Sequence, residues 1–216
     1  MKQALVLVAH ADDETLGAGG TIQRLVKADW SVQIVVMADG IVSVRGDSTQ
    51  DNRPGTIAAC QRLGVGEPTF MGFPDQKFDS VPMADLAGSV GALGMSPDLI
   101  ITHVESDLNR DHRLTLEVAR IVGRPRSKPV SIVGCEIPNT TFWNNRTFAP
   151  NYYVDITQEL AGKVEAFQLY TNEIQAFPHP WSAQGLELLA KYHGMQCGHD
   201  FAEAFVIYRA NDNQLL

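Results

Sequence analysis

Residues 5–22 read LVLVAHADDETLGAGGTI, and this stretch predicts both the fold and the place of a site. The apolar run Leu5–Ala9 is short and rich in β-branched residues, which is typical of a buried strand. His10, Asp12, Asp13 and Glu14 follow at once, and titratable groups are costly to bury unless something binds them. Because open α/β sheets bind ligands at the carboxyl ends of their strands, we predict a metal site here.

Strand-like and helix-like patterns alternate along the rest of the chain. Strands are expected at residues 4–9, 32–38, 69–73, 98–103, 131–137, 152–156 and 203–209. Helices are expected at residues 15–28, 50–63, 83–93, 110–122, 158–170 and 183–192. The order predicts a single α/β domain over residues 1–210, Rossmann-like and three-layered, with a mostly parallel sheet and the metal site at the carboxyl ends of its strands. Residues 211–216 are expected to be a frayed tail, and residues 138–150 a long polar and aromatic loop.

The composition excludes several classes of protein. The chain has 216 residues and a formal net charge of −8, which argues against nucleic acid or an anionic membrane as the main partner. Cys60, Cys135 and Cys197 show no metal-binding spacing, so free thiols in a reducing compartment are expected. The first residues are too short for a signal peptide, and no apolar run is long enough to span a membrane. We therefore expect a cytoplasmic protein, and a homo-oligomer is compatible with the sequence.

The residues after the first strand match the chemistry of zinc, which takes nitrogen and oxygen ligands and leaves one position open for water in catalytic sites. His10 offers an imidazole. Asp12 and Asp13 are adjacent, so in an extended segment they point to different sides, one to the metal and the other to the substrate. The alternative is that one of the two aspartates caps the helix that begins near Thr15.

A third ligand is expected from the segment after the fourth strand, because its carboxyl end lies at the same edge of a parallel sheet. His103 and His112 are both candidates, and their spacing alone does not choose between them. Asp111, beside His112, would suit a carboxylate that orients a ligand imidazole. Alternatively, Asp111 only complements the amino end of the helix.

The combination resembles the PIG-L or LmbE-like family of zinc-dependent N-acetylglucosamine deacetylases. The signature Ala-His-Pro-Asp-Asp-Glu of that family appears here as Ala9-His10-Ala11-Asp12-Asp13-Glu14, and its Asp-His motif as Asp111-His112. Further stretches are similar to bacterial members, so the resemblance extends over roughly residues 2–209. These stretches are GFPD at 72–75, DLNRDHR at 107–113, PHP at 178–180 and AEAF at 202–205.

The resemblance implies a role for each residue of the site. His10, Asp13 and His112 would bind zinc and Asp12 would be the general base, so that His103 is not a ligand. The same set of ligands also admits Fe²⁺, and the sequence does not decide which metal is bound in the cell. Arg53 matches an arginine that helps to hold substrate. Trp143 resembles part of a loop that faces the sugar. His179, held between two prolines, is expected in an extended backbone that aims its ring at the cleft, or else in an ordered surface turn.

Four residues depart from the family pattern and bear on the substrate more than on the metal. Ala11 replaces a proline. Asn109 stands where some members have a histidine that stabilises the oxyanion, and an amide can donate a hydrogen bond but cannot carry a proton. Phe201 replaces a common tyrosine, and Trp181 a common arginine.

The function that we predict is hydrolysis of the acetyl group from an N-acetylated amino sugar or its conjugate, by a metal-activated water with Asp12 as the base. One alternative is a related zinc amidase that acts on a thiol conjugate or a longer acyl chain. Another is a nucleotide-binding module, because Gly17, Gly19 and Gly20 lie between a strand and a helix. A sugar-binding protein with a degenerate site is a third.

Overall fold

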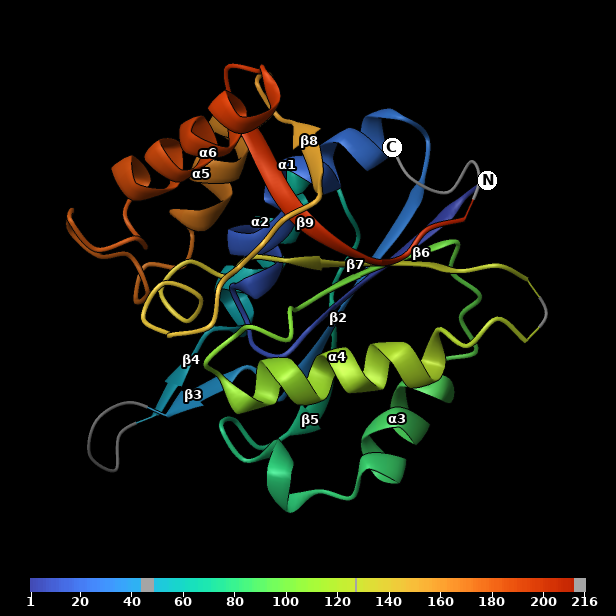
Figure 1. The fold of residues 1–216 in the computed structure, drawn as a ribbon. Helices are drawn as coiled ribbons and strands as arrows, with labels where there is room; N and C mark the ends of the chain where they lie inside the picture. Colours follow the sequence, from blue (N-terminus) through green and yellow to red (C-terminus); the bar gives the residue numbers. More distant parts are fainter. Residues whose placement is uncertain (44–48, 127, 212–216) are drawn as a thin grey trace.

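The apolar run at the start of the chain forms β1 (Gln3–Val8), which lies inside a seven-stranded sheet (Figure 1). The computed structural model describes residues 1–43, 49–126 and 128–211, so most of the expected tail lies outside the described residues. Residues 4–8 of β1 are almost fully buried, because helices cover both faces of the sheet. The predicted three-layer α/β fold is confirmed.

The sheet has the strand order β5-β2-β1-β6-β7-β9-β8 among the described residues. Its first five strands are parallel, and β9 runs antiparallel between β7 and β8. The sheet is therefore mostly parallel, as predicted. The bounds are β2 Ser31–Ala38, β5 Thr69–Phe73, β6 Leu99–Thr102, β7 Ser131–Cys135, β8 Tyr152–Asp155 and β9 Ala202–Arg209.

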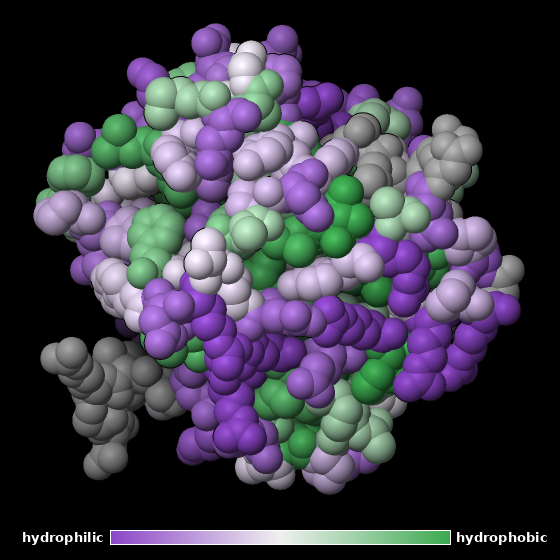
Figure 2. All heavy atoms as spheres, viewed as in Figure 1, coloured by the Kyte–Doolittle hydropathy of each residue, from purple (hydrophilic) through white to green (hydrophobic). Residues whose placement is uncertain are grey.

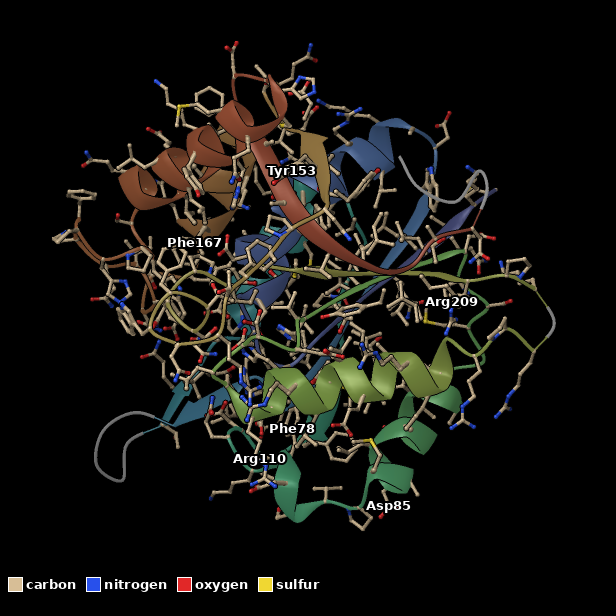
Figure 3. All side chains as sticks on the ribbon, in the orientation of Figure 1. Phe78, Asp85, Arg110, Tyr153, Phe167 and Arg209 are labelled. Atoms are coloured by element: carbon tan, nitrogen blue, oxygen red, sulfur yellow. The ribbon has the colours of Figure 1, made fainter. Side chains whose placement is uncertain are left out.

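The helices divide between the two faces (Figure 1). On one face lie α1 (Asp13–Lys27), α2 (Arg53–Leu63), α5 (Leu160–Phe167) and α6 (Ala183–Cys197). The other face carries α3 (Met83–Gly91), α4 (Arg110–Val122) and a short 3-10 turn at Phe78–Ser80. The exposed side of α4 forms a hydrophilic band across the lower half of Figure 2. Phe78 lies below the start of α4, where Arg110 begins the helix (Figure 3), and it is fully buried.

One expected helix starts later than predicted. Residues 50 and 51 belong to β4 (Thr49–Asp51), which pairs with β3 (Ile41–Ser43) in a two-stranded antiparallel sheet. The helix begins only at Arg53 because Pro54 lacks an N–H, and a proline is tolerated in a helix only in its first turn.

Two helices near the end of the chain also differ in length from the prediction. Helix α6 continues to Cys197 rather than ending at residue 192, and its end is marked by Gly198, whose φ of 82° is the left-handed conformation of a glycine cap. Helix α5 is shorter than the expected span 158–170 at both ends.

The glycines after the first strand serve packing and not phosphate binding. They lie inside α1, where a Cβ added at Gly17 would come within 2.4 Å of Cys135 Sγ and one at Gly20 within 2.6 Å of Ile156 Cγ2. A helix that packs this closely needs glycine at both positions, and the alternative of a phosphate loop between strand and helix is contradicted. The three cysteines are free thiols, as expected. None of the described helices has the length and apolarity needed to cross a membrane.

Candidate metal centre

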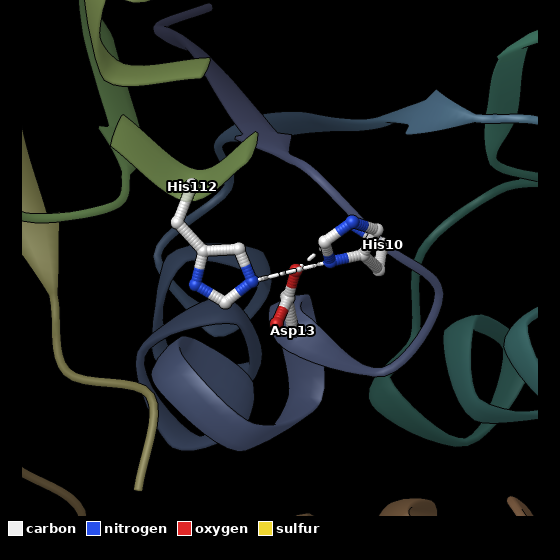
Figure 4. A group of neighbouring side chains, drawn as sticks. All are labelled: His10, Asp13 and His112. Carbon is white, nitrogen blue, oxygen red and sulfur yellow. Dashed lines mark hydrogen bonds and ion pairs between the residues drawn. The ribbon is translucent and has the colours of Figure 1, made fainter. Parts of the chain in front are cut away.

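Three side chains from two distant parts of the chain meet at the carboxyl edge of the sheet (Figure 4). His10 follows β1, Asp13 begins α1, and His112 lies in the first turn of α4 after β6. Strands β1 and β6 are parallel neighbours, which brings their carboxyl ends together. His10 Nδ1 lies 3.2 Å from His112 Nε2, and Asp13 Oδ2 lies 3.6 Å from the first atom and 3.4 Å from the second.

The other nitrogen of each imidazole is held by carboxylates. His112 Nδ1 lies 2.9 Å from Asp107 Oδ2 and donates to it. His10 Nε2 lies 3.3 Å from Asp111 Oδ2 and 3.3 Å from Asp75 Oδ1. With the protons on those nitrogens, His112 Nε2 and His10 Nδ1 both present lone pairs to the Asp13 carboxylate. Asp111, predicted to orient a ligand imidazole, contacts His10 and not its sequence neighbour His112, whose carboxylate partner is Asp107.

This donor set suits a tetrahedral zinc ion. Zn–N and Zn–O bonds of about 2.0–2.1 Å at tetrahedral angles place neighbouring ligand atoms about 3.3–3.4 Å apart. The three observed separations of 3.2, 3.4 and 3.6 Å lie close to this value. Three converging acceptor atoms repel one another unless a proton or a cation lies among them. His10, Asp13 and His112 therefore form a buried group that could hold a metal ion.

His103 belongs to a second group that could hold a metal, together with Asp107 and His112. However, the backbone N–H of Ala9 donates to His103 Nε2 over 2.9 Å, which occupies the lone pair of that nitrogen. Burial, followed by the nearby His112, holds the pKa of His103 well below its ordinary value, so the ring is neutral and its proton is on Nδ1. Neither ring nitrogen of His103 then offers a lone pair to a metal.

Asp12 has an unusual backbone and a side chain that does not cap the helix. Its φ is 123°, which is strained for a residue with a Cβ, and its side chain makes no capping hydrogen bond to α1. The alternative of a capping role is thus contradicted for Asp12. Burial, followed by the charges of Asp13 and Glu173, raises the pKa of Asp12 well above its ordinary value. Such a carboxylate has a higher affinity for protons, as a general base requires.

The two metal-facing groups of the first loop also have shifted pKa values. Burial raises the pKa of Asp13 to about 7, although His10 opposes the shift. Burial lowers the pKa of His10, but the hydrogen bond to Asp111 and the surrounding carboxylates raise it by more, so the net shift is upward. The upward shift of Asp13 thus reflects its burial, and that of His10 reflects the carboxylates around it.

Glu14 supports the strained backbone of Asp12, which the sequence did not indicate. Its Oε2 accepts the backbone N–H of Asp12 over 3.2 Å, and its Oε1 accepts the hydroxyls of Thr15, over 2.6 Å, and of Tyr170. Tyr170 lies 156 residues further along the chain. Only the three-dimensional structure could have found Tyr170, whereas the position of Asp107 five residues before His112 was visible in the sequence.

Asn109 is the amino-terminal cap of α4. Its Oδ1 accepts the backbone N–H of Asp111 over 2.9 Å, and its Nδ2 donates to Gln76 Oε1 over 3.3 Å. Gln76 Nε2 in turn lies 3.4 Å from His10 Nε2. Asn109 thus borders the metal group through Gln76, a residue to which sequence reasoning assigned no role.

The predicted substrate residues lie at two different places. Arg53 is exposed, and its guanidinium forms a two-pronged pair with Asp51 through Nε at 2.9 Å and Nη2 at 2.8 Å. Trp143 and His179 lie together, with ring centroids 5.7 Å apart, and both line a cavity of about 890 Å³. None of His10, Asp12, Asp13 and His112 lines this cavity.

The backbone at His179 is not extended, in contrast to that prediction. Residues 177–181 form turns, and the His179 N–H donates to Ala176 O over 3.0 Å. Side chains close the turn, because Ser182 Oγ donates to His179 O over 2.8 Å and the Trp181 N–H donates to His179 Nδ1 over 3.1 Å. The backbone thus forms an ordered turn, and the His179 ring nevertheless lines the cavity, so that its contact with substrate stays a prediction.

Comparisons with known proteins identify a family. The family model described as PIG-L, GlcNAc-PI de-N-acetylase, matches residues 5–122, which is more than half of the chain. A diacetylchitobiose deacetylase of Thermococcus kodakarensis is 25% identical over 233 residues, covering 94% of this chain and 82% of its own.

Two solved structures show the same fold and carry different activities in their descriptions. The N,N'-diacetylchitobiose deacetylase from Pyrococcus horikoshii has 20% identity and a TM-score of 0.77, covering 98% of this chain and 87% of its own. The 4-carboxy-2-hydroxymuconate hydratase GalB from Pseudomonas putida has 21% identity and a TM-score of 0.75, with 100% of both chains covered. The fold alone therefore does not determine the reaction.

Proposed function

Because the chain belongs to the PIG-L family, we propose that it is a zinc-dependent hydrolase that removes the acetyl group from an N-acetylated amino sugar. The observation that carries the proposal is the convergence of His10 Nδ1, Asp13 Oδ2 and His112 Nε2 beside the buried carboxylate of Asp12. The similarity to a diacetylchitobiose deacetylase supports an N-acetylated sugar as the substrate. We place the enzyme in the cytoplasm because its cysteines are free thiols.

In this proposal His10, Asp13 and His112 hold the metal, and Asp107 and Asp111 orient the two imidazoles. When bound, zinc supplies Lewis acidity, which makes water a nucleophile near neutral pH and polarises the acetyl carbonyl. Iron(II) would be held by the same ligands.

Asp12 acts as the base and then as the acid. Its carboxylate takes a proton from water as the water oxygen bonds to the acetyl carbon. It then passes that proton to the amine nitrogen as the C–N bond breaks. The products are acetate and the free amino sugar. Asn109, whose Nδ2 now donates to Gln76, would turn that N–H toward the developing oxyanion, and Arg53, Trp143 and His179 would contact the rest of the substrate.

The test is Asp12→Asn, assayed for amine release from N-acetylglucosamine and its glycosides in the presence of zinc. The variant should keep about one zinc per chain and lose ~10²–10⁴-fold in kcat, which is the usual contribution of a general base. Asp85→Asn, an exposed carboxylate on α3, is the matched control and should retain full activity. Full activity of Asp12→Asn would overturn the assignment of the base. If the zinc-loaded protein releases no amine from any such sugar, the proposed deacetylase activity is refuted. A hydration reaction, as in the description of the GalB neighbour, would then be the next candidate to test.

A further inference from the structure

A second cavity lies at the opposite edge of the sheet from the metal centre. Its volume is about 780 Å³, which is in the range of small-molecule sites. It lies between α3, the end of α4 and described residues of the segment that leads from α4 to β7 (Figure 1). Leu5, near the start of β1, and Pro97, just before β6, also line it. The metal ligands and Asp12 do not line it, so a ligand bound here is independent of the proposed reaction.

The interior of this cavity is apolar, and α3 presents only small side chains to it over one face. Ala84, Ala87, Gly88 and Gly91 recur at helical spacing, so they share a face of α3, and all four line the cavity. A Cβ added at Gly88 or at Gly91 meets no atom beyond the local helix backbone within 4 Å, so the space beside these glycines is open. Larger apolar side chains complete the lining, and two of them are methionines, which adapt to ligands of different shape. They are Met83, Val90, Met95, Ile121, Val122 and Val130.

The rim of the cavity is basic. Arg124, Arg126 and Lys128 line it, and none of its described lining residues is acidic. Lys128 Nζ is paired with Asp98 Oδ1 over 2.8 Å, whereas Arg124 and Arg126 are exposed and form no ion pair with any residue that the structure describes. This local positive charge contrasts with the formal net charge of −8 of the whole chain. Guanidinium groups bind carboxylates and phosphates through two parallel hydrogen bonds.

The two parts of the cavity together determine the kind of ligand that fits. A wholly apolar ligand would leave the guanidinium groups of Arg124 and Arg126 without a partner. A small anion such as inorganic phosphate would leave the apolar interior in contact with water. A ligand that carries both an alkyl chain and an anionic head group satisfies the interior and the rim at once.

We propose that this cavity binds a single-chain amphiphile, that is, an alkyl chain that ends in a carboxylate or a phosphate. The alkyl chain lies against the small residues of α3, and the head group contacts Arg124 and Arg126 at the rim. The ligand enters at the amino edge of the sheet and leaves the metal centre at the carboxyl edge free for substrate.

The experiment measures the Kd of decanoate by isothermal titration calorimetry. It uses the metal-free full chain, so that the carboxylate has no zinc to bind. Decanoate should bind at least about ten-fold more tightly than hexanoate, because burial of one methylene group is worth roughly four-fold in Kd. Decanol should bind about ten-fold more weakly than decanoate, because it offers the guanidinium groups no charged partner. A comparison of decanoate with decyl phosphate assigns the head group, and tight binding of either supports the proposal.

Variants at the interior and at the rim locate the binding. Gly88→Leu places a side chain in the open space and should weaken decanoate binding by at least about ten-fold. It should remain folded because leucine favours a helix more than glycine does. Ala92→Leu is the matched control, because Ala92 is exposed at the end of α3 and does not line the cavity. Arg124→Gln combined with Arg126→Gln should weaken decanoate about ten-fold and leave decanol unchanged. Its control is Arg62→Gln, an exposed arginine of α2.

Each contrary outcome overturns the proposal. Absence of binding of both decanoate and decyl phosphate to the wild type would refute it, and so would an unchanged Kd in both the Gly88→Leu and the double arginine variants. The arginine variant alters only exposed residues and so tests the site even if Gly88→Leu does not fold. Binding to vesicles of phosphatidylglycerol but to neither monomeric amphiphile would make this surface a membrane contact. If light scattering shows that Gly88→Leu converts an oligomer to a monomer, and the wild type binds no amphiphile, a second copy of the chain covers the cavity.

Discussion

Two groups of buried charges lie along α1, and they are satisfied in opposite ways. In its middle, Glu203 accepts the N–H groups of Gly20 over 2.9 Å and Thr21 over 2.7 Å, the Thr21 hydroxyl, and the ammonium of Lys163 over 2.6 Å. At its start, by contrast, Asp12 and Asp13 make no ion pair with a lysine or arginine among the described residues.

The difference distinguishes a structural charge from a functional one. The Glu203 carboxylate accepts hydrogen bonds from all of the donors around it, and its role is to join α1 to α5 and β9. A buried carboxylate that faces two imidazole lone pairs lacks a positively charged partner, and a metal ion from solution would supply one. Removal of the carboxylate charge should therefore leave the stability of the metal-free protein unchanged or higher at Asp13 and should lower it at Glu203.

The largest expected effect is that of Asp13→Asn on metal binding. Wild type should gain about 4 kcal/mol of stability at a zinc concentration of roughly 1,000 times Kd, and the variant should gain none of it. The metal-free variant should be at least as stable as metal-free wild type, because burial raises the pKa of Asp13 to about 7 and its charge is therefore costly there. Thermal unfolding with and without zinc measures both effects. A zinc-dependent rise in Tm in the variant would contradict the ligand assignment.

An effect of similar size is expected at the second group, the buried pair of Glu203 and Lys163 in the middle of α1. Glu203→Ala leaves the buried ammonium of Lys163 without a partner, and breaking such a pair lowers the free energy of unfolding by about 3–5 kcal/mol. Urea unfolding of the metal-free protein measures the loss. The double variant Glu203→Ala, Lys163→Met should recover part of it. If Glu203→Ala costs no more stability than Asp13→Asn, the contrast between the two groups is wrong.

A smaller effect is expected when only the partner of a ligand is changed. Asp107→Asn keeps an oxygen beside His112 Nδ1 but removes its charge, and changes of this kind typically lower metal affinity by roughly 10–100-fold. Competition with a chromophoric chelator measures the affinity. An unchanged affinity would mean that Asp107 does not orient His112.

The smallest effect on zinc affinity is expected at Thr140, which contacts Asp107 and not the ligand His112 itself. Thr140→Val removes the hydroxyl that donates to Asp107 Oδ2 and preserves the shape of the side chain. Loss of one such hydrogen bond is worth about 1 kcal/mol, so zinc affinity should fall by less than about ten-fold. The same chelator assay measures the affinity. If Thr140→Val lowers zinc affinity more than Asp107→Asn does, Thr140 does not act through Asp107.

Most of the fold could be predicted because local patterns and global packing agree. The strand at residues 4–9 is apolar throughout because it is buried on both faces, and the alternation with helices leaves few other topologies. The hairpin of β3 and β4 was missed because neither strand exceeds three residues, which is too short for a periodic signal. The end of α6 was misplaced because Gly194 lies inside the helix, packed against the backbone of His199 and Asp200.

The sequence by itself determined that an imidazole and two adjacent carboxylates follow the first buried strand, and its motifs pointed to a family. The tertiary structure decided the protonation and the partners of these groups. The N–H of Ala9, 94 residues away in the chain, occupies the lone pair of His103 and leaves His112 to face Asp13. Asp107 and Asp111 likewise divide between the two histidines in an order that spacing does not reveal. The physical reason is that a hydrogen bond sets the tautomer of an imidazole, and such bonds form between residues that only folding brings together.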